Sequence, residues 1–205
     1  MEYENVVKAP FIALAVKLKS ELISLAPDYH FPSKGLGRIK RPAFKVAAGM
    51  PLYKDWLSYI ASKPAASRFE SQPHLFFGLF PNEKDRILVA CGLWRPSSRQ
   101  TRLIREAISK DSEPFKKLFK SKNFKARFPN GFSMDEVSAR TPRGFPDQHK
   151  DIHWIKLKNF IVMRKLTVPQ LSSKTFSDEL AEDLKQGLKL NRLLEKAIAM
   201  QWTST

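Results

Sequence analysis

Apolar side chains recur at helical spacing near both ends of this chain and gather into short continuous runs in its middle. The helical spacing predicts one amphipathic helix over about residues 3–26 and a long final helix from Ser177 onward. Residues 74–80 and 87–94 are apolar and rich in β-formers, and the turn sequence Pro-Asn-Glu-Lys-Asp separates them at residues 81–85. Two such runs around a turn predict a β-hairpin.

The segments around this hairpin carry weaker patterns. Ser97 or Ser98 begins one predicted helix and Ser112-Glu113-Pro114 begins another, which together make a basic helical pair over about residues 97–127. The remaining predictions are strand fragments at 38–40, 43–46 and 160–163, one or two helical turns at 152–157, and a segment at 52–60 that fits either helix or strand.

These elements predict an α+β fold, in which a central antiparallel sheet is flanked by the N- and C-terminal helices and by the basic helical pair. The length of 205 residues suits a single domain over residues 1–205, with the helical segment of about 97–127 inserted after the hairpin. The sequence contains neither an internal repeat nor a low-complexity tract.

Charge is the unusual feature of the composition. The chain has 36 Lys and Arg against 20 Asp and Glu, for a formal net charge of +16. Such a field attracts polyanions, although it also serves plain solubility. Cys91 has no second cysteine to pair with, and no apolar stretch is long enough for a signal or a membrane span. We therefore expect a cytoplasmic protein without a transmembrane segment.

Two short motifs indicate where a site lies. Residues 92–96 read Gly-Leu-Trp-Arg-Pro, and residues 142–145 read Pro-Arg-Gly-Phe with His149 four positions beyond. Each motif places an aromatic ring and a guanidinium beside backbone that proline stiffens and glycine frees. Apolar area joined to a permanent planar cation is typical of a site lining.

These motifs, in this order, resemble one known family, the bacterial and fungal conserved hypothetical proteins called domain of unknown function 2461. The family has a Gly-Leu-Trp-x-Pro motif, and its Pro-Arg-Gly-Phe motif is followed by a histidine at the spacing of His149 and then by a lysine and a phenylalanine, matched by Lys158 and Phe160. Residues 38–54 follow a basic family segment that ends in Pro-Tyr-Lys, with Leu52 inserted before the tyrosine.

The resemblance implies kinship without a reaction, because the family has no assigned activity. Residues 48–50 read Ala-Gly-Met where the family has an acidic residue and a lysine, so this segment is altered here. The helix that usually opens the family has no counterpart before Met1. A groove left uncovered by that helix would favour a homodimer.

The arginines supply the main binding hypothesis. Arg38, Arg41 and Arg143 together would form a fork-shaped grip on a carboxylate or phosphate, and the alternative is that they serve structural ion pairs. The predicted ligand-binding residues are Arg38, Arg41, Tyr53, Lys54, Trp94 and Arg143. Trp94 would shape the pocket, and its alternative role is to close the edge of the core.

His149 is the candidate catalytic residue, since an imidazole titrates near neutrality. His153 lies four positions on, at helical metal-binding reach, but no third ligand is evident and we expect no metal and no cofactor. Cys91 sits within an apolar run and is predicted to be a core residue rather than a nucleophile.

Three functions remain open on the sequence. The first is a non-catalytic module that binds an anionic small molecule or a polyanion through the arginine pocket. The second is a hydrolase acting on a small acidic or phosphorylated substrate, with His149 as acid or base. The third is a basic interaction module, which includes nucleic-acid binding through the helices of residues 99–127, where phenylalanines alternate with lysines.

Overall fold

A four-stranded antiparallel sheet forms the centre of the molecule, with its strands in chain order. The structure is a computed structural model and describes residues 5, 8–32, 40–65, 67, 70–81 and 87–199. The strands are β1 (Leu57–Ser62), β2 (His74–Leu79), β3 (Ile87–Leu93) and β4 (Phe160–Leu166). The hairpin predicted from the two apolar runs is therefore β2–β3, and β4 joins it at the far edge.

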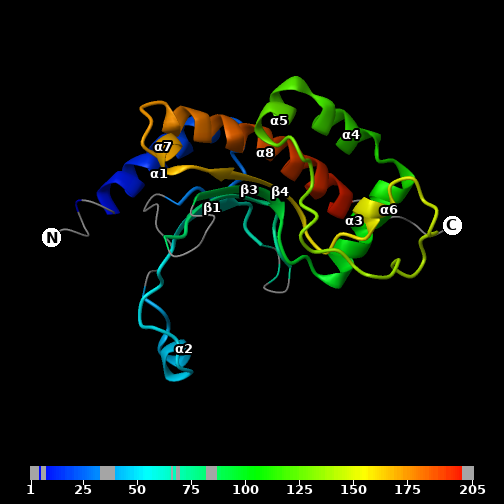
Figure 1. The fold of residues 1–205 in the computed structure, drawn as a ribbon, viewed down its shortest axis with the longest axis horizontal. Coiled ribbons are helices and arrows are strands. Elements are labelled where there is room, and N and C mark those ends of the chain that lie inside the picture. Colours follow the sequence, from blue (N-terminus) through cyan, green and yellow to red (C-terminus); the bar gives the residue numbers. More distant parts are fainter. Residues whose placement is uncertain are drawn as a thin grey trace.

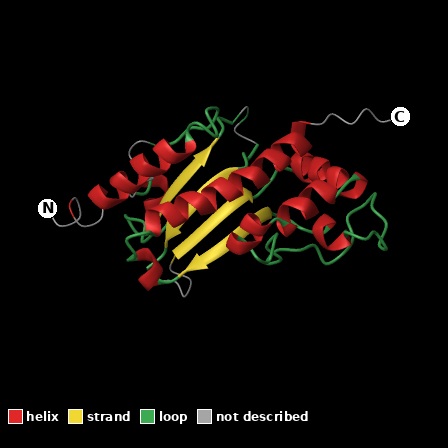
Figure 2. Cartoon of the chain, turned by 90° about the horizontal axis from the view of Figure 1, so that it is seen from above, coloured by secondary structure: helices red, strands yellow, loops and turns green. Residues whose placement is uncertain are grey.

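Helices cover one face of this sheet, and none of the described helices packs on its other face (Figures 1 and 2). The long α8 (Phe176–Ala199) packs on β3 and β2, and α1 (Ala9–Leu22) and α3 (Ser98–Lys110) pack against α8. The other helices are α2 (Ala43–Ala47), α4 (Glu113–Lys120), α5 (Lys122–Arg127), α6 (Ile152–Ile155) and α7 (Val168–Leu171). None of the described helices is long and apolar enough to cross a membrane.

Strand alternation explains how one sheet has two different faces. In β2, Leu75 and Phe77 point toward the helices and are fully buried. Phe76 points to the opposite face, where the register aligns Ile60, Phe76, Ala90 and Met163 in one row across the four strands. The core therefore lies between the sheet and α8, while the described helices leave a second apolar surface on the opposite face.

The α+β class and the terminal helices are confirmed, and several local predictions need correction. Residues 43–46 form the short helix α2 rather than a strand, because the Pro42 carbonyl accepts from the Lys45 and Val46 amides. The ambiguous segment 52–60 becomes loop and then β1. The second basic helix is divided into α4 and α5 at Ser121, and α8 begins at Phe176, one residue before its predicted cap.

A buried carboxylate links α8 to β4. Asp183 is fully buried, and both of its oxygens accept from Arg164 Nη1 at 2.7 Å, while Arg127 Nη1 lies 3.5 Å away. Removal from water outweighs the two guanidiniums and raises the pKa of Asp183 to about 6. The folded protein therefore holds this proton more tightly than the unfolded chain does.

This raised pKa predicts how stability depends on pH. The contribution of Asp183 is fully present below its ordinary value of 3.8 and is lost as the pH rises through about 6. Between pH 4 and pH 7 we expect the free energy of unfolding of the wild type to fall by roughly 2 kcal/mol through this group. The Asp183→Asn variant should lack this fall. Urea unfolding between pH 4 and pH 7 measures both proteins. Parallel stability curves for the two proteins would show that Asp183 ionises at its ordinary pKa.

Candidate functional site

The Pro-Arg-Gly-Phe loop and the first turns of α3 enclose a small hollow of about 280 Å³. The loop carries Arg143 at the surface, and Phe145 of the same loop packs against the core. The hollow is lined by Ser98, Thr101, Arg102, Arg105, Pro142, Arg143 and Phe145. Three arginines thus line one space, and no carboxylate occurs among the described residues of its lining.

Local sequence explains why α3 begins at this place. The Ser97 hydroxyl accepts from the Gln100 amide at 3.2 Å, and the Gln100 side chain accepts from the Ser97 amide at 2.9 Å. This reciprocal capping box fixes the first turn. Gln100 Nε2 also donates to the Ser71 carbonyl at 2.6 Å, which ties the helix start to the segment before β2. The helix that carries Arg102 and Arg105 is therefore held in place at its N-terminal end.

The three arginines differ in how far their donors are satisfied. Arg105 Nη2 donates to the Leu157 carbonyl at 3.0 Å, but its Nε is buried and has no partner among the described residues. Burial lowers the pKa of Arg105, which nevertheless stays protonated. Arg102 Nε donates to Glu106 at 2.6 Å, and both side chains of that pair lie outward on α3. Arg143 is exposed. The hollow therefore combines a partly desolvated cation with two exposed ones, of which Arg102 is already paired with Glu106.

His149 is held at both ring nitrogens by backbone. Its Nε2 lies 3.1 Å from the Ser109 carbonyl, and its Nδ1 accepts from the Asp151 amide at 3.1 Å. A carbonyl only accepts, so the proton resides on Nε2 of a neutral ring. His149 thus ties the end of α3 to the segment before α6. It is not among the residues that line the arginine hollow, and its acid or base role stays a prediction.

Trp94, in the Gly-Leu-Trp-Arg-Pro motif, does not line the arginine hollow. It lines a second hollow, on the face of the sheet opposite α8. Gly92 has φ +123°, and the backbone of Phe160 and Ile161 in β4 passes directly beside it. Arg95 has φ +50°, its amide donates to Asn159 Oδ1 at 2.7 Å, and its guanidinium lies 5.8 Å from the Trp94 ring. The chain thus turns sharply at the end of β3, and this turn directs Trp94 outward, where 39% of the residue is exposed.

Residues 40–54 form an arm that projects from the sheet with α2 at its tip (Figure 1). Lys40 and Tyr53 pair as an isolated bridge, and the Arg41 amide donates to the Leu52 carbonyl at 2.8 Å. Tyr53 is exposed, and Lys54 Nζ lies 4.5 Å from the Trp56 ring centre. Figure 1 shows α2, at the tip of this arm, well apart from α3, which borders the arginine hollow.

The predicted fork of Arg41 and Arg143 finds no support in this hollow, whose lining includes Arg143 but not Arg41. Arg38 lies outside the described residues. Arg143 instead shares the hollow with Arg102 and Arg105, which belong to the basic stretch of residues 99–127 that was predicted as an interaction surface. Arg102 and Arg105 are three residues apart, which places them on one face of a helix, and this spacing was the signal in the sequence that they share a site.

Comparison with known proteins relates the chain to one family of proteins. No curated protein and no solved structure matches the sequence. The family model of the conserved hypothetical proteins DUF2461 matches residues 1–192, a span that includes every described element through most of α8. Both motifs that shape the hollows lie within that span. The chain belongs to the DUF2461 family of conserved hypothetical proteins.

Proposed function

We propose that this protein is a cytoplasmic, non-catalytic module that binds a phosphate- or carboxylate-bearing molecule in the hollow between α3 and the Pro-Arg-Gly-Phe loop. The observation that carries the proposal is the convergence of Arg102, Arg105 and Arg143 on one space whose described lining holds no acid. Guanidiniums match the paired oxygens of carboxylates and phosphates, and they bind them best where water is partly excluded.

The state of the lining supports binding rather than catalysis. The buried Nε of Arg105 still needs an acceptor, which an anion oxygen would supply. The Thr101 hydroxyl already donates to the Ser97 carbonyl at 2.9 Å. Cys91 is buried in the sheet, and burial raises the pKa of its thiol well above the usual range. These groups suit a permanent cationic site more than proton transfer.

We expect Arg143→Ala to weaken the binding of inorganic phosphate at least about tenfold, because one charge-assisted contact is lost. Isothermal titration with phosphate measures the affinity at fixed ionic strength. Lys117→Ala is the matched control, since Lys117 is an exposed cation on α4 outside the hollow and should leave the affinity unchanged. Equal losses in the two variants would show that phosphate responds only to the net charge of the molecule.

A polyanion surface is the second candidate, and the lysines of α4 and α5 favour it. Lys117, Lys120, Lys122 and Lys125 are all exposed. Phe119 and Phe124 lie between these lysines along the chain. Phe124 is fully buried and Phe119 packs against the core, so neither is available to stack on bases. Any nucleic acid on this surface would be held through its phosphates, and its affinity would fall steeply with salt.

A further inference from the structure

The face of the sheet opposite α8, on which no described helix packs, is a concave trough that the anion site does not use. Figure 1 shows the sheet arched away from the helices, and a hollow of about 610 Å³ occupies the inner side of the arch. Its central lining is apolar and comes from all four strands, namely Ile60, Phe76, Leu88, Ala90, Ile161 and Met163. A volume of this size falls in the range of small-molecule sites.

Aromatic rings fix the walls of this trough. Phe80 stacks between Phe76 and Trp56, with ring centres 6.3 Å and 5.9 Å apart. Trp94 stands on the rim, where the turn at Gly92 and the bond from the Arg95 amide to Asn159 set its position. Phe76, Phe80 and Trp56 hold one another by ring stacking, and the backbone turn fixes the chain at Trp94, so the walls of the trough are largely preformed. Flat aromatic surfaces of this kind bind flat apolar molecules.

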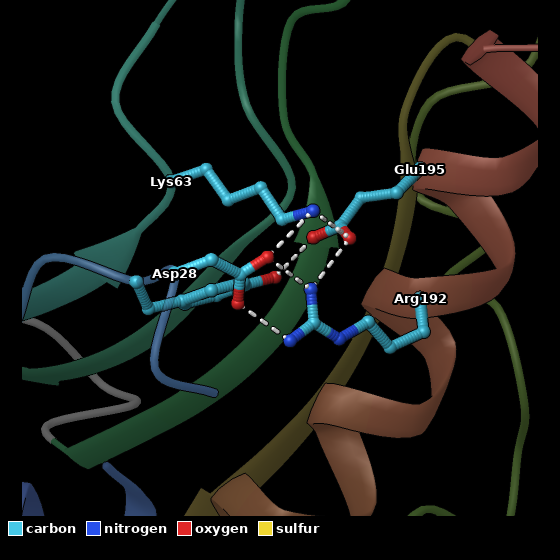
Figure 3. A network of polar contacts seen from close by, with 5 residues as sticks. Asp28, Lys63, Arg192 and Glu195 are labelled. Carbon is cyan, nitrogen blue, oxygen red and sulfur yellow. Dashed lines mark hydrogen bonds and ion pairs between the residues drawn. The ribbon is translucent and has the colours of Figure 1, made fainter. Parts of the chain in front are cut away.

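One end of the trough is polar but carries no unbalanced charge. Lys63 reaches this end, and its Nζ lies 2.9 Å from Asp28 and 2.7 Å from Glu195 (Figure 3). Arg192 on α8 pairs with the same two carboxylates at 2.7 Å and 2.9 Å. Two cations and two anions therefore neutralise one another, and this end offers little attraction to an anionic ligand.

His74 gives the same end its hydrogen-bonding character. Its Nδ1 lies 3.1 Å from the Gln72 carbonyl, so Nδ1 donates and Nε2 is left as an acceptor toward the trough. Burial lowers the pKa of His74, which keeps the ring neutral. An occupant that satisfies this nitrogen has to bring a donor, such as a hydroxyl group.

We propose that the trough binds a small, flat, mainly apolar molecule whose hydroxyl group donates to His74 Nε2, and that it does so independently of the anion site. A second protein is disfavoured as the occupant because the exposed lining of the trough is far below the roughly 800 Å² per partner that a stable interface buries. A carboxylate is disfavoured because it would face an acceptor nitrogen and a neutralised lysine.

The first test is a titration with 2-naphthol, with 2-naphthoate as the ligand of matched ring and different head group. We expect 2-naphthol to bind with a dissociation constant of about 1 mM or below and 2-naphthoate to bind at least about tenfold more weakly. Ala90→Phe places a ring in the middle of the trough and should abolish 2-naphthol binding. His74→Leu removes the acceptor nitrogen and should bring the two ligands within about twofold of each other.

Matched controls separate this site from the arginine hollow and from misfolding. Arg143→Ala should leave 2-naphthol binding unchanged, so failure of the anion proposal and failure of this one are distinguishable. His74→Leu keeps the apolar floor even where Ala90→Phe does not fold. The proposal is overturned when wild type shows no binding of 2-naphthol, when Ala90→Phe binds it unchanged, or when sedimentation shows a dimer that Ala90→Phe dissociates.

Discussion

Replacing Gly92 with alanine is expected to destabilise the protein by at least about 3 kcal/mol. A Cβ at this position would lie 2.2 Å from the Phe160 carbonyl oxygen and 2.8 Å from Ile161 Cα. Both are backbone atoms of the paired strand β4, so relief requires the β3–β4 ladder to open. The positive φ of +123° adds strain of its own. Urea unfolding measures the loss as a lower transition midpoint.

Gly144→Ala is the control that separates the clash from the strain. Gly144 also has a positive φ, of +92°, but a Cβ there would meet no heavy atom within 4 Å. Its replacement should therefore cost about 1 kcal/mol, from backbone strain alone. Similar losses in the two variants would mean that β4 moves away from Gly92 easily. The close approach of the β4 backbone would then not be the reason why this position needs a glycine.

The sequence predicted well those elements whose patterns are long or strongly alternating. The terminal helices and the β2–β3 hairpin each carry many apolar positions at one period, so packing and local preference agree. The arm of residues 40–54 has no such agreement. Its Phe44, Met50 and Tyr53 are exposed, so burial does not shape this segment, and the choice between strand and helix at 43–47 fell to the turn at Pro42.

The candidate site was harder to predict because sequence motifs give residue types without giving directions. Trp94 and Arg143 both line hollows, as their motifs indicated, but the hollows are different ones. Only the register and the side on which α8 packs decide that Leu88 and Ala90 face the trough while Val89 and Cys91 face the core. The apolar run 87–91 has too little alternation to show that one face stays uncovered.

The packing of α8 on the sheet leads to the second large expected effect, from Gly187→Ala. A Cβ on Gly187 would lie 2.1 Å from Cys91 Sγ and 2.5 Å from Cys91 Cβ. Cys91 is fully buried in the centre of β3 and cannot turn aside. The helix would have to lift from the sheet, and we expect a loss of about 3 kcal/mol in the free energy of unfolding.

Second-site substitutions at Cys91 test whether this contact is the cause. Cys91→Ala removes the sulfur but keeps the Cβ, so it should relieve the Gly187→Ala variant only in part. Cys91→Gly removes both atoms, and the double variant should be more stable than the sum of the two single losses predicts by at least about 1 kcal/mol. Urea unfolding of the full cycle gives this coupling energy. Strictly additive losses would place the cost of Gly187→Ala elsewhere in α8, whereas the graded rescue would show that helix and sheet approach at a spacing set by a glycine facing a cysteine.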